Sequence, residues 1–122
     1  GTLYRVGTRK VPGNRLWLRS SRGDTFFYAH LSAFAESARN GARVRAGDVL
    51  GFVGDTGDAE RTPPHLHFEV HPQAGAAVNP YRFLRAWDER RDVPPAAWLD
   101  RYGQDPGARP GVLVVVEDFL AR

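Results

Sequence analysis

The most informative segment of this sequence is His65 to His71, in which polar and apolar side chains alternate. Successive side chains of a β-strand point to opposite faces, so the segment is expected to form a strand with one apolar and one polar face. The apolar face would carry Leu66, Phe68 and Val70, and the polar face His65, His67, Glu69 and His71. Three of the four histidines in the chain therefore fall on one side of one strand, with neighbouring imidazoles about 6.5 to 7 Å apart.

The fourth histidine, His30, lies near the end of a second strand-like segment, Phe26 to Leu31. Strict alternation would place Phe26, Tyr28 and His30 on one face. A histidine at a strand end is commonly structural, but His30 would converge with the other histidines if the two strands are neighbours. Neutral imidazole binds metals and also transfers protons near neutral pH. The histidines are therefore candidates for metal-assisted hydrolysis, although His-x-His alone also suits a solvated polar face.

Turn residues separate further strand-like segments in the first two-thirds of the chain. We expect strands at residues 2–6, 15–19, 25–31 and 65–71, and either a last strand or an incomplete element at residues 112–116. Weak helical character is present at residues 33–40, and short helices are expected at residues 80–89 and 95–102. The expected fold class is mainly β, a small antiparallel sheet with a barrel-like core and short C-terminal helices.

Composition limits the class of protein further. With 122 residues, 42% hydrophobic and 25% charged, the chain suits one globular domain. It has no cysteine, which excludes disulfide scaffolds and cysteine-type zinc sites. No apolar run approaches the roughly 20 residues that span a bilayer, so no transmembrane segment is expected. The formal charge of +3 comes mostly from scattered arginines, and we expect no nucleic-acid partner.

Four segments match, in order, the motifs of one family. They are Tyr28-Ala29-His30-Leu31-Ser32, the glycine-rich pattern from Gly41 to Gly57, Pro64-His65-Leu66-His67-Phe68-Glu69-Val70, and Val78-Asn79-Pro80. Together they resemble the C-terminal part of the LytM/lysostaphin-type zinc endopeptidases over residues 1–85. The resemblance implies an antiparallel β fold with a duplicated hybrid motif, and hydrolysis of peptide bonds in the cross-links or stems of bacterial peptidoglycan. It also implies a secreted, periplasmic or cell-wall-associated location.

The same resemblance assigns roles to individual histidines. His67 matches a zinc ligand, and His65 and His30 match the two catalytic histidines. In the family's mechanism zinc polarises the scissile carbonyl and activates water, while the catalytic histidines handle protons and stabilise the oxyanion. Glu69 could orient an imidazole as a partner outside the zinc ligands, although a plain polar strand position explains it equally well. His71 matches no family role and is expected to be a surface histidine.

One part of the family pattern is missing. Family members carry a His-x-x-x-Asp motif before the first hairpin, which supplies the other two zinc ligands, yet no histidine precedes His30 here. A catalytic zinc takes three protein ligands and water, so His67 alone should not hold it tightly. The chain is either an excerpt that begins after the motif or a degenerate member that lost the metal. The start at Gly1 without methionine, and the joint presence of the three motif histidines, favour the excerpt.

Other interpretations remain open. Residues 41–57 also resemble biotinyl and lipoyl carrier domains, but the only lysine, Lys10, lacks the usual setting for modification. A non-catalytic module that binds the wall or activates a partner hydrolase is the stronger alternative. We expect residues 1–85 to form the peptidase domain without its N-terminal part and residues 86–122 an extension of short helices, a Pro/Gly linker and a final strand. The expected cofactor is zinc, the expected partner a peptidoglycan peptide, and the chain alone is expected to be inactive.

Overall fold

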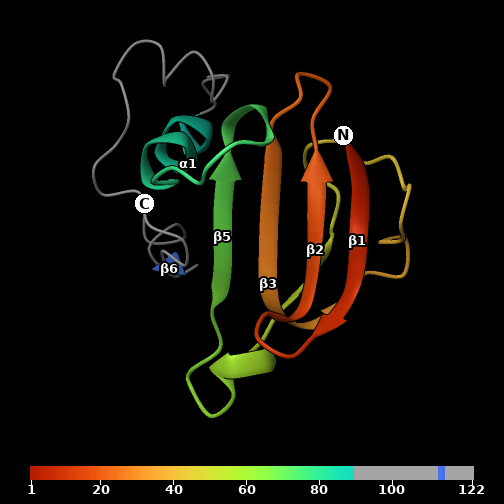
Figure 1. Cartoon of the computed structure of the whole chain (residues 1–122), viewed down its shortest axis with the longest axis vertical. Helices are drawn as coiled ribbons and strands as arrows, with labels where there is room; N and C mark the ends of the chain where they lie inside the picture. Colours follow the sequence, from red (N-terminus) through yellow and green to blue (C-terminus); the bar gives the residue numbers. More distant parts are fainter. Residues whose placement is uncertain (90–112, 115–122) are drawn as a thin grey trace.

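The computed structural model describes residues 1–89 and 113–114, which form an open antiparallel sheet with a helix beside one edge (Figure 1). The strands are β1 (Thr2–Arg9), β2 (Gly13–Arg19), β3 (Thr25–Phe34), β4 (Gly51–Val53), β5 (Leu66–His71) and β6 (Leu113–Val114). The helical elements are α1 (Tyr81–Asp88) and the 3₁₀ turns η1 (Gly57–Ala59) and η2 (Pro72–Ala74). The expected fold class, mainly antiparallel β, is confirmed.

Strand order places the two histidine-bearing strands side by side. The sheet runs β1, β2, β3, β5, β6, and β4 pairs with β3 outside this row. The hairpin expected between β2 and β3 is present, and its strands pair from Arg19 opposite Thr25 to Asn14 opposite Leu31. β3 also pairs with β5, with Ala29 opposite His67. Convergence of the histidines depends on the two strands being neighbours in the sheet, and β3 and β5 are neighbours.

One face of the sheet carries the hydrophobic core. Leu3, Leu16 and Val70 are fully buried on it, and burying such a side chain contributes about 1.5 to 3 kcal/mol. Apolar side chains from residues 35–50 pack against the β1–β2 half of this face. Phe83 of α1 packs against the β3–β5 half, and Figure 1 shows α1 next to β5. Because the core occupies this face, the histidines of β5 lie on the opposite one.

The helix expected at residues 33–40 is absent. Ala33 and Phe34 instead continue β3 and pair with Phe52 and Gly51 of β4, and residues 35–40 form turns. Pairing with a strand supplied by a distant segment overrides the weak local helical preference. The helix expected at residues 80–89 is confirmed as α1, and Asn79 Oδ1 accepts a hydrogen bond from the Tyr81 amide at its start (3.0 Å).

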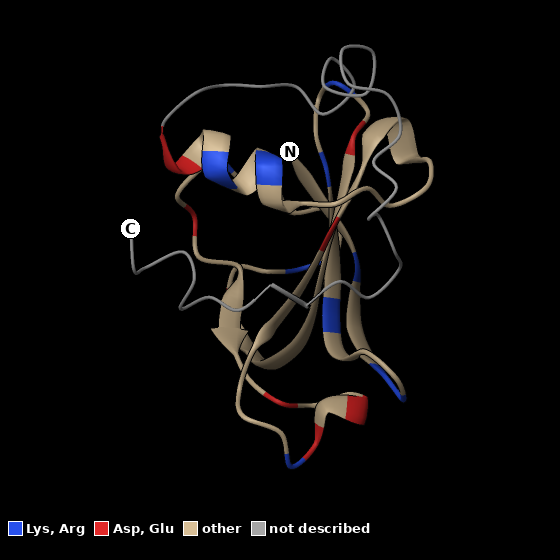
Figure 2. Ribbon diagram, turned by 90° about the vertical axis from the view of Figure 1, so that its left-hand side faces the viewer, with Lys and Arg blue, Asp and Glu red and all other residues tan. Residues whose placement is uncertain are grey.

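The C-terminal expectations are only partly covered by the structure. The strand expected at residues 112–116 coincides with β6, which pairs with β5, while the rest of that range and the helix expected at residues 95–102 lie outside the described residues. None of the described helices has the length and apolar character needed to cross a bilayer. Figure 2 shows basic and acidic residues distributed over α1, strands and loops, as their scattered positions in the sequence indicate.

Candidate active site

His30 reaches the histidine face through a break in the alternation of β3. Phe26 and Tyr28 pack in the core, but His30 does not share their face, so the predicted face of His30 is wrong. Its backbone is left-handed (φ 61°), and the pairing register with β2 shifts between Leu16 and Asn14. This irregularity is a β-bulge, which turns two successive side chains to one side. Ala29 and His30 consequently both face the cavity.

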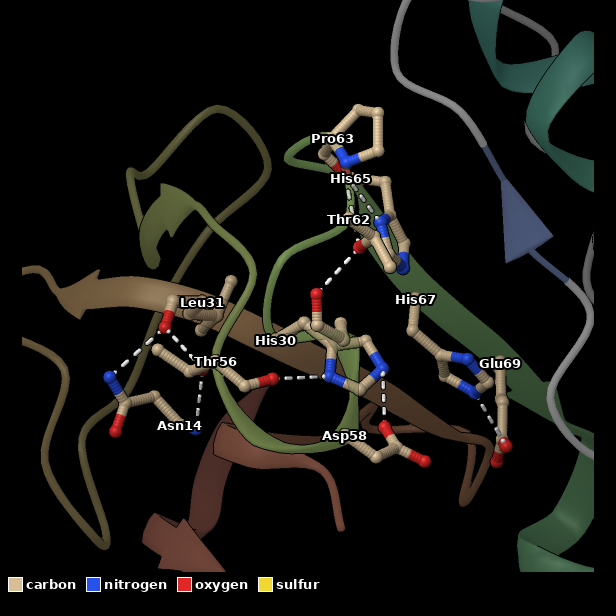
Figure 3. Close-up of polar contacts among 11 residues, drawn as sticks. Asn14, His30, Leu31, Thr56, Asp58, Thr62, Pro63, His65, His67 and Glu69 are labelled. Carbon is tan, nitrogen blue, oxygen red and sulfur yellow. Dashed lines mark hydrogen bonds and ion pairs between the residues drawn. The ribbon is translucent and has the colours of Figure 1, made fainter.

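Three imidazoles converge on this face, from the two neighbouring strands and the residue that precedes β5. The ring centroid of His30 lies 5.3 Å from that of His65 and 5.7 Å from that of His67 (Figure 3). The three rings line one cavity of about 580 Å³, together with Phe27 and Glu69. The three histidines are thus brought together on one face, and the cavity volume lies within the roughly 300 to 1,000 Å³ range of ligand-binding clefts.

Backbone carbonyls set the tautomers of His30 and His65. His30 Nδ1 lies 2.7 Å from the carbonyl oxygen of Thr56, and His65 Nδ1 lies 2.9 Å from that of Pro63. A carbonyl oxygen can only accept, so each Nδ1 carries the hydrogen and donates it. In the neutral rings Nε2 is then unprotonated and able to take up a proton. Both histidines are therefore arranged as potential general bases.

Glu69 joins two histidines on the polar face of β5. Its Oε1 lies 2.9 Å from His67 Nε2, and its Oε2 lies 2.6 Å from His71 Nε2. Hydrogen bonds from His67 and then from His71 lower the pKa of Glu69 to about 2, which outweighs the opposing effect of burial. The bond to Glu69 in turn raises the pKa of His71. His71 is not the surface histidine that we expected, because its side chain is only 16% exposed and both ring nitrogens are bonded.

Two residues of the site escape sequence reasoning. Asp58, which suggests only a turn former in the sequence, lies on the cavity wall with Oδ1 3.6 Å from His30 Nε2. Thr56 supplies the carbonyl that orients His30, and its hydroxyl donates to the carbonyl of Leu31 (2.8 Å) and accepts from the amide of Asn14 (3.0 Å). Thr56 belongs to the glycine-rich family pattern, and this membership is the only sequence signal that points to Thr56 as part of the site. Nothing in the sequence places Asp58 beside His30.

The described residues do not make a complete zinc site. His67 suits a ligand, because its Nε2 is bonded to Glu69 and Nδ1 has no hydrogen-bond partner within the described part of the chain. However, residues 1–89 and 113–114 contain no group of three or more His, Cys, Asp or Glu side chains that could hold a metal ion. A catalytic zinc takes three protein ligands, so the described donor set does not fit one.

Clustered imidazoles on one face of an open antiparallel sheet provide groups suited to general acid–base chemistry. The model of the protein family described as Peptidase family M23 matches residues 1–80, two-thirds of the chain. The chain therefore belongs to this family. The resemblance to LytM/lysostaphin-type endopeptidases is thereby confirmed.

Curated relatives agree with this assignment. The DD-carboxypeptidase/endopeptidase Mpg of Neisseria meningitidis serogroup B is 47% identical over 80 residues, which cover 66% of this chain and 17% of that protein. The L-Ala--D-Glu endopeptidase of Bacillus subtilis is 32% identical over 96 residues, which cover 72% of this chain and 29% of that protein. The chain thus spans less than a third of the length of these relatives.

Solved structures share the fold. The catalytic domain of lysostaphin from Staphylococcus simulans superposes with a TM-score of 0.59 at 31% identity, covering 70% of this chain and 65% of that one. A zinc-containing peptidase from Vibrio cholerae gives a TM-score of 0.56 at 29% identity, covering 64% and 22%. The SpoIIQ–SpoIIIAH pore-forming complex gives 0.63 at 27% identity, covering 80% and 55%.

Proposed function

We propose that this chain carries the histidine part of an M23 endopeptidase site that hydrolyses peptide bonds in the cross-links or stems of peptidoglycan. The observation that carries the proposal is the convergence of His30, His65 and His67 on one cavity, with the tautomers of His30 and His65 set by backbone carbonyls. Two relatives are named L-Ala--D-Glu endopeptidase and DD-carboxypeptidase/endopeptidase, and these names support peptide bonds as the substrate class.

In this proposal His30 and His65 are the catalytic residues. Amide hydrolysis requires the attacking water to lose a proton and the leaving amine to gain one. The unprotonated Nε2 of either ring can accept the first proton, and the resulting imidazolium can stabilise the oxyanion or donate to the amine. The carbonyls of Thr56 and Pro63 keep the rings oriented throughout, because they remain acceptors in both protonation states.

His67 is the proposed metal ligand, and zinc is the proposed cofactor by family membership. When bound, zinc would polarise the scissile carbonyl and activate water. The described residues supply too few ligands to hold this ion by themselves. A peptidoglycan substrate lies outside the cytoplasmic membrane, so the proposed location is secreted, periplasmic or cell-wall-associated. The proposed division into a peptidase domain (residues 1–85) and an extension (residues 86–122) stays a prediction.

The test is hydrolysis of purified peptidoglycan by the longest natural form of the protein that contains this chain. Replacing His65→Ala should reduce the release of soluble peptide fragments, measured by mass spectrometry, by at least about 100-fold, since general acid–base groups contribute about 100- to 10,000-fold. Bound zinc should be unchanged in this variant. The matched control is Glu36→Ala, an exposed residue in the turn that follows β3, which should keep wild-type rates. Retained hydrolysis in His65→Ala would contradict the assignment.

A non-catalytic module is the second candidate function. It is favoured by the absence of a three-ligand group among the described residues and by the similarity to a SpoIIQ chain, whose description names a pore-forming complex rather than a peptidase. In that case the protein would sediment with peptidoglycan, wild type and His65→Ala would bind equally, and neither would release fragments.

A further inference from the structure

A chain of hydrogen bonds runs through the polar face of β5 and ends at the candidate metal ligand. The carbonyl oxygen of Gly75 lies 2.8 Å from His71 Nδ1, His71 Nε2 lies 2.6 Å from Glu69 Oε2, and Glu69 Oε1 lies 2.9 Å from His67 Nε2. Sequence reasoning assigns no role to His71 and leaves two interpretations of Glu69 open. Their geometry connects both residues to the cavity.

The partners along this chain determine where each hydrogen lies. The Gly75 carbonyl can only accept, so His71 Nδ1 carries a hydrogen. An ionised carboxylate also only accepts, so the nitrogens that face Glu69 on His71 and His67 are both protonated. His71 is then an imidazolium, Glu69 a carboxylate, and His67 a ring whose Nε2 carries the hydrogen and whose Nδ1 does not.

The surroundings make this arrangement strong. The side chains of His67, Glu69 and His71 are only 12%, 14% and 16% exposed, so water screens their interactions poorly. The ring of Trp17 lies 5.1 Å from that of His71, within the range in which an aromatic ring attracts a cation. Charge-assisted hydrogen bonds such as these are shorter and stronger than neutral ones.

The turn after β5 supplies the last acceptor in this series of hydrogen bonds, the carbonyl oxygen of Gly75. The 3₁₀ turn η2 follows His71 directly, and Gln73 and Ala74 within it adopt left-handed backbone conformations (φ 51° and 58°). The turn reverses the backbone so that the carbonyl of Gly75 returns to the ring of His71. A buried carboxylate, Asp24, accepts from the amide of Gln73 (2.9 Å) and fixes the turn to the β2–β3 hairpin.

We propose that Glu69 and His71 are positioning residues: through the bond from His67 to Glu69, they hold His67 in the Nε2–H tautomer and leave Nδ1 as its unprotonated nitrogen. A neutral imidazole can bind a metal or accept a proton only at its unprotonated nitrogen, so the pair selects which atom of His67 is available. The functional meaning of this selection rests on the proposed function. The tautomer itself does not, because it exists without metal or substrate.

The experiment is long-range ¹H–¹⁵N NMR of the imidazole rings in the metal-free 122-residue chain labelled with ¹⁵N-histidine. Each ring is assigned by its loss in the corresponding single histidine variant. The wild-type spectrum should show His67 as the Nε2–H tautomer in about tenfold excess or more, as expected for a hydrogen bond to a charged group. It should also show His71 protonated at both nitrogens at neutral pH.

Two variants test whether Glu69 and His71 cause the tautomer preference of His67. Glu69→Ala should bring the two tautomers of His67 to comparable populations, and His71→Phe should lower the excess by a smaller factor while keeping Glu69. Glu36→Ala removes an exposed carboxylate elsewhere and should leave the spectrum of His67 unchanged. Backbone amide spectra report whether each variant is folded.

The proposal is overturned if wild-type His67 is mainly the Nδ1–H tautomer, or if its tautomer excess survives in folded Glu69→Ala. The wild-type measurement decides the first point even if a variant fails to fold. Loss of peptidoglycan hydrolysis plays no part in these readouts, so failure of the proposed function and failure of this proposal are distinguishable.

Discussion

Two backbone carbonyl groups determine what the catalytic candidates can do at the scale of single residues. Thr56 and Pro63 each hold the Nδ1 hydrogen of one histidine, so His30 and His65 keep an unprotonated Nε2 when neutral. Residue identity contributes little to this, because any residue could supply a carbonyl. Sequence motifs therefore identify the imidazoles but not their tautomers, which depend on where the backbone passes.

A residue on the core face gives a prediction about alkaline pH. Burial raises the pKa of Tyr28 to about 12, whereas an unfolded tyrosine titrates near pH 10. Because the folded pKa is the higher, the stability contributed by the neutral phenol is complete below about pH 10 and is lost as pH rises through 12. The free energy of unfolding, measured with urea, should fall by about 3 kcal/mol over this interval on account of Tyr28.

The Tyr28→Phe variant removes this titration and should flatten the alkaline fall. The Tyr4→Phe variant is the matched control, because Tyr4 stacks on Trp17 rather than in the core clusters, and it should retain the fall seen in the wild type. An unchanged alkaline fall in Tyr28→Phe would show that another group is responsible.

At the scale of elements, sequence periodicity succeeded for β5 and failed within β3. The alternation from Leu66 to His71 is uninterrupted, and a regular strand transmits it unchanged to the two faces. In β3 the bulge at His30 adds a residue to one side, and the sequence carries no signal of it beyond the family motif. The helix expected at residues 33–40 failed for a related reason, since β4 pairs with Ala33 and Phe34 from a distant segment.

The loop that carries Thr56 gives a prediction about the element that orients His30. Gly57 has a φ of +75°, and a Cβ at this position would overlap the backbone at Gly13 and Val11. The Gly57→Ala variant should therefore lose about 2 to 5 kcal/mol of stability in urea unfolding, through backbone strain and overpacking. Displacement of this loop should also release His30 from the Thr56 carbonyl, and the imidazole NMR signal of His30 should shift.

The matched control for this loop is Gly41→Ala. Gly41 has a similar φ of +84°, but a Cβ there would meet nothing within 4 Å, so only the strain of about 1 to 2 kcal/mol applies. Equal losses in the two variants would show that close packing of the Thr56 loop against β2 is not what holds it in place.

At the scale of the whole molecule, the chain unites proton-transfer groups without a complete metal site among its described residues. Calorimetric titration of the metal-free chain with zinc should therefore show no binding tighter than micromolar, because a single imidazole ligand contributes too little. His67→Ala is the control, and any weak binding through this ligand should decrease further in it. A stoichiometric site with nanomolar affinity in the wild type would contradict the incomplete ligand set.

The placement of the histidines on separate strands also has a consequence for folding order. β3 and β5 are neighbours in the sheet, yet residues 35–65 separate them in the chain. Closing a loop of this length costs entropy before the contacts between the strands can offset that cost. Non-local pairing of this kind slows folding. The β2–β3 hairpin can form locally, but it brings only His30. Contact between the rings of His30 and His67 is therefore a reporter of the completed sheet, and refolding followed at these rings tracks long-range assembly rather than hairpin formation.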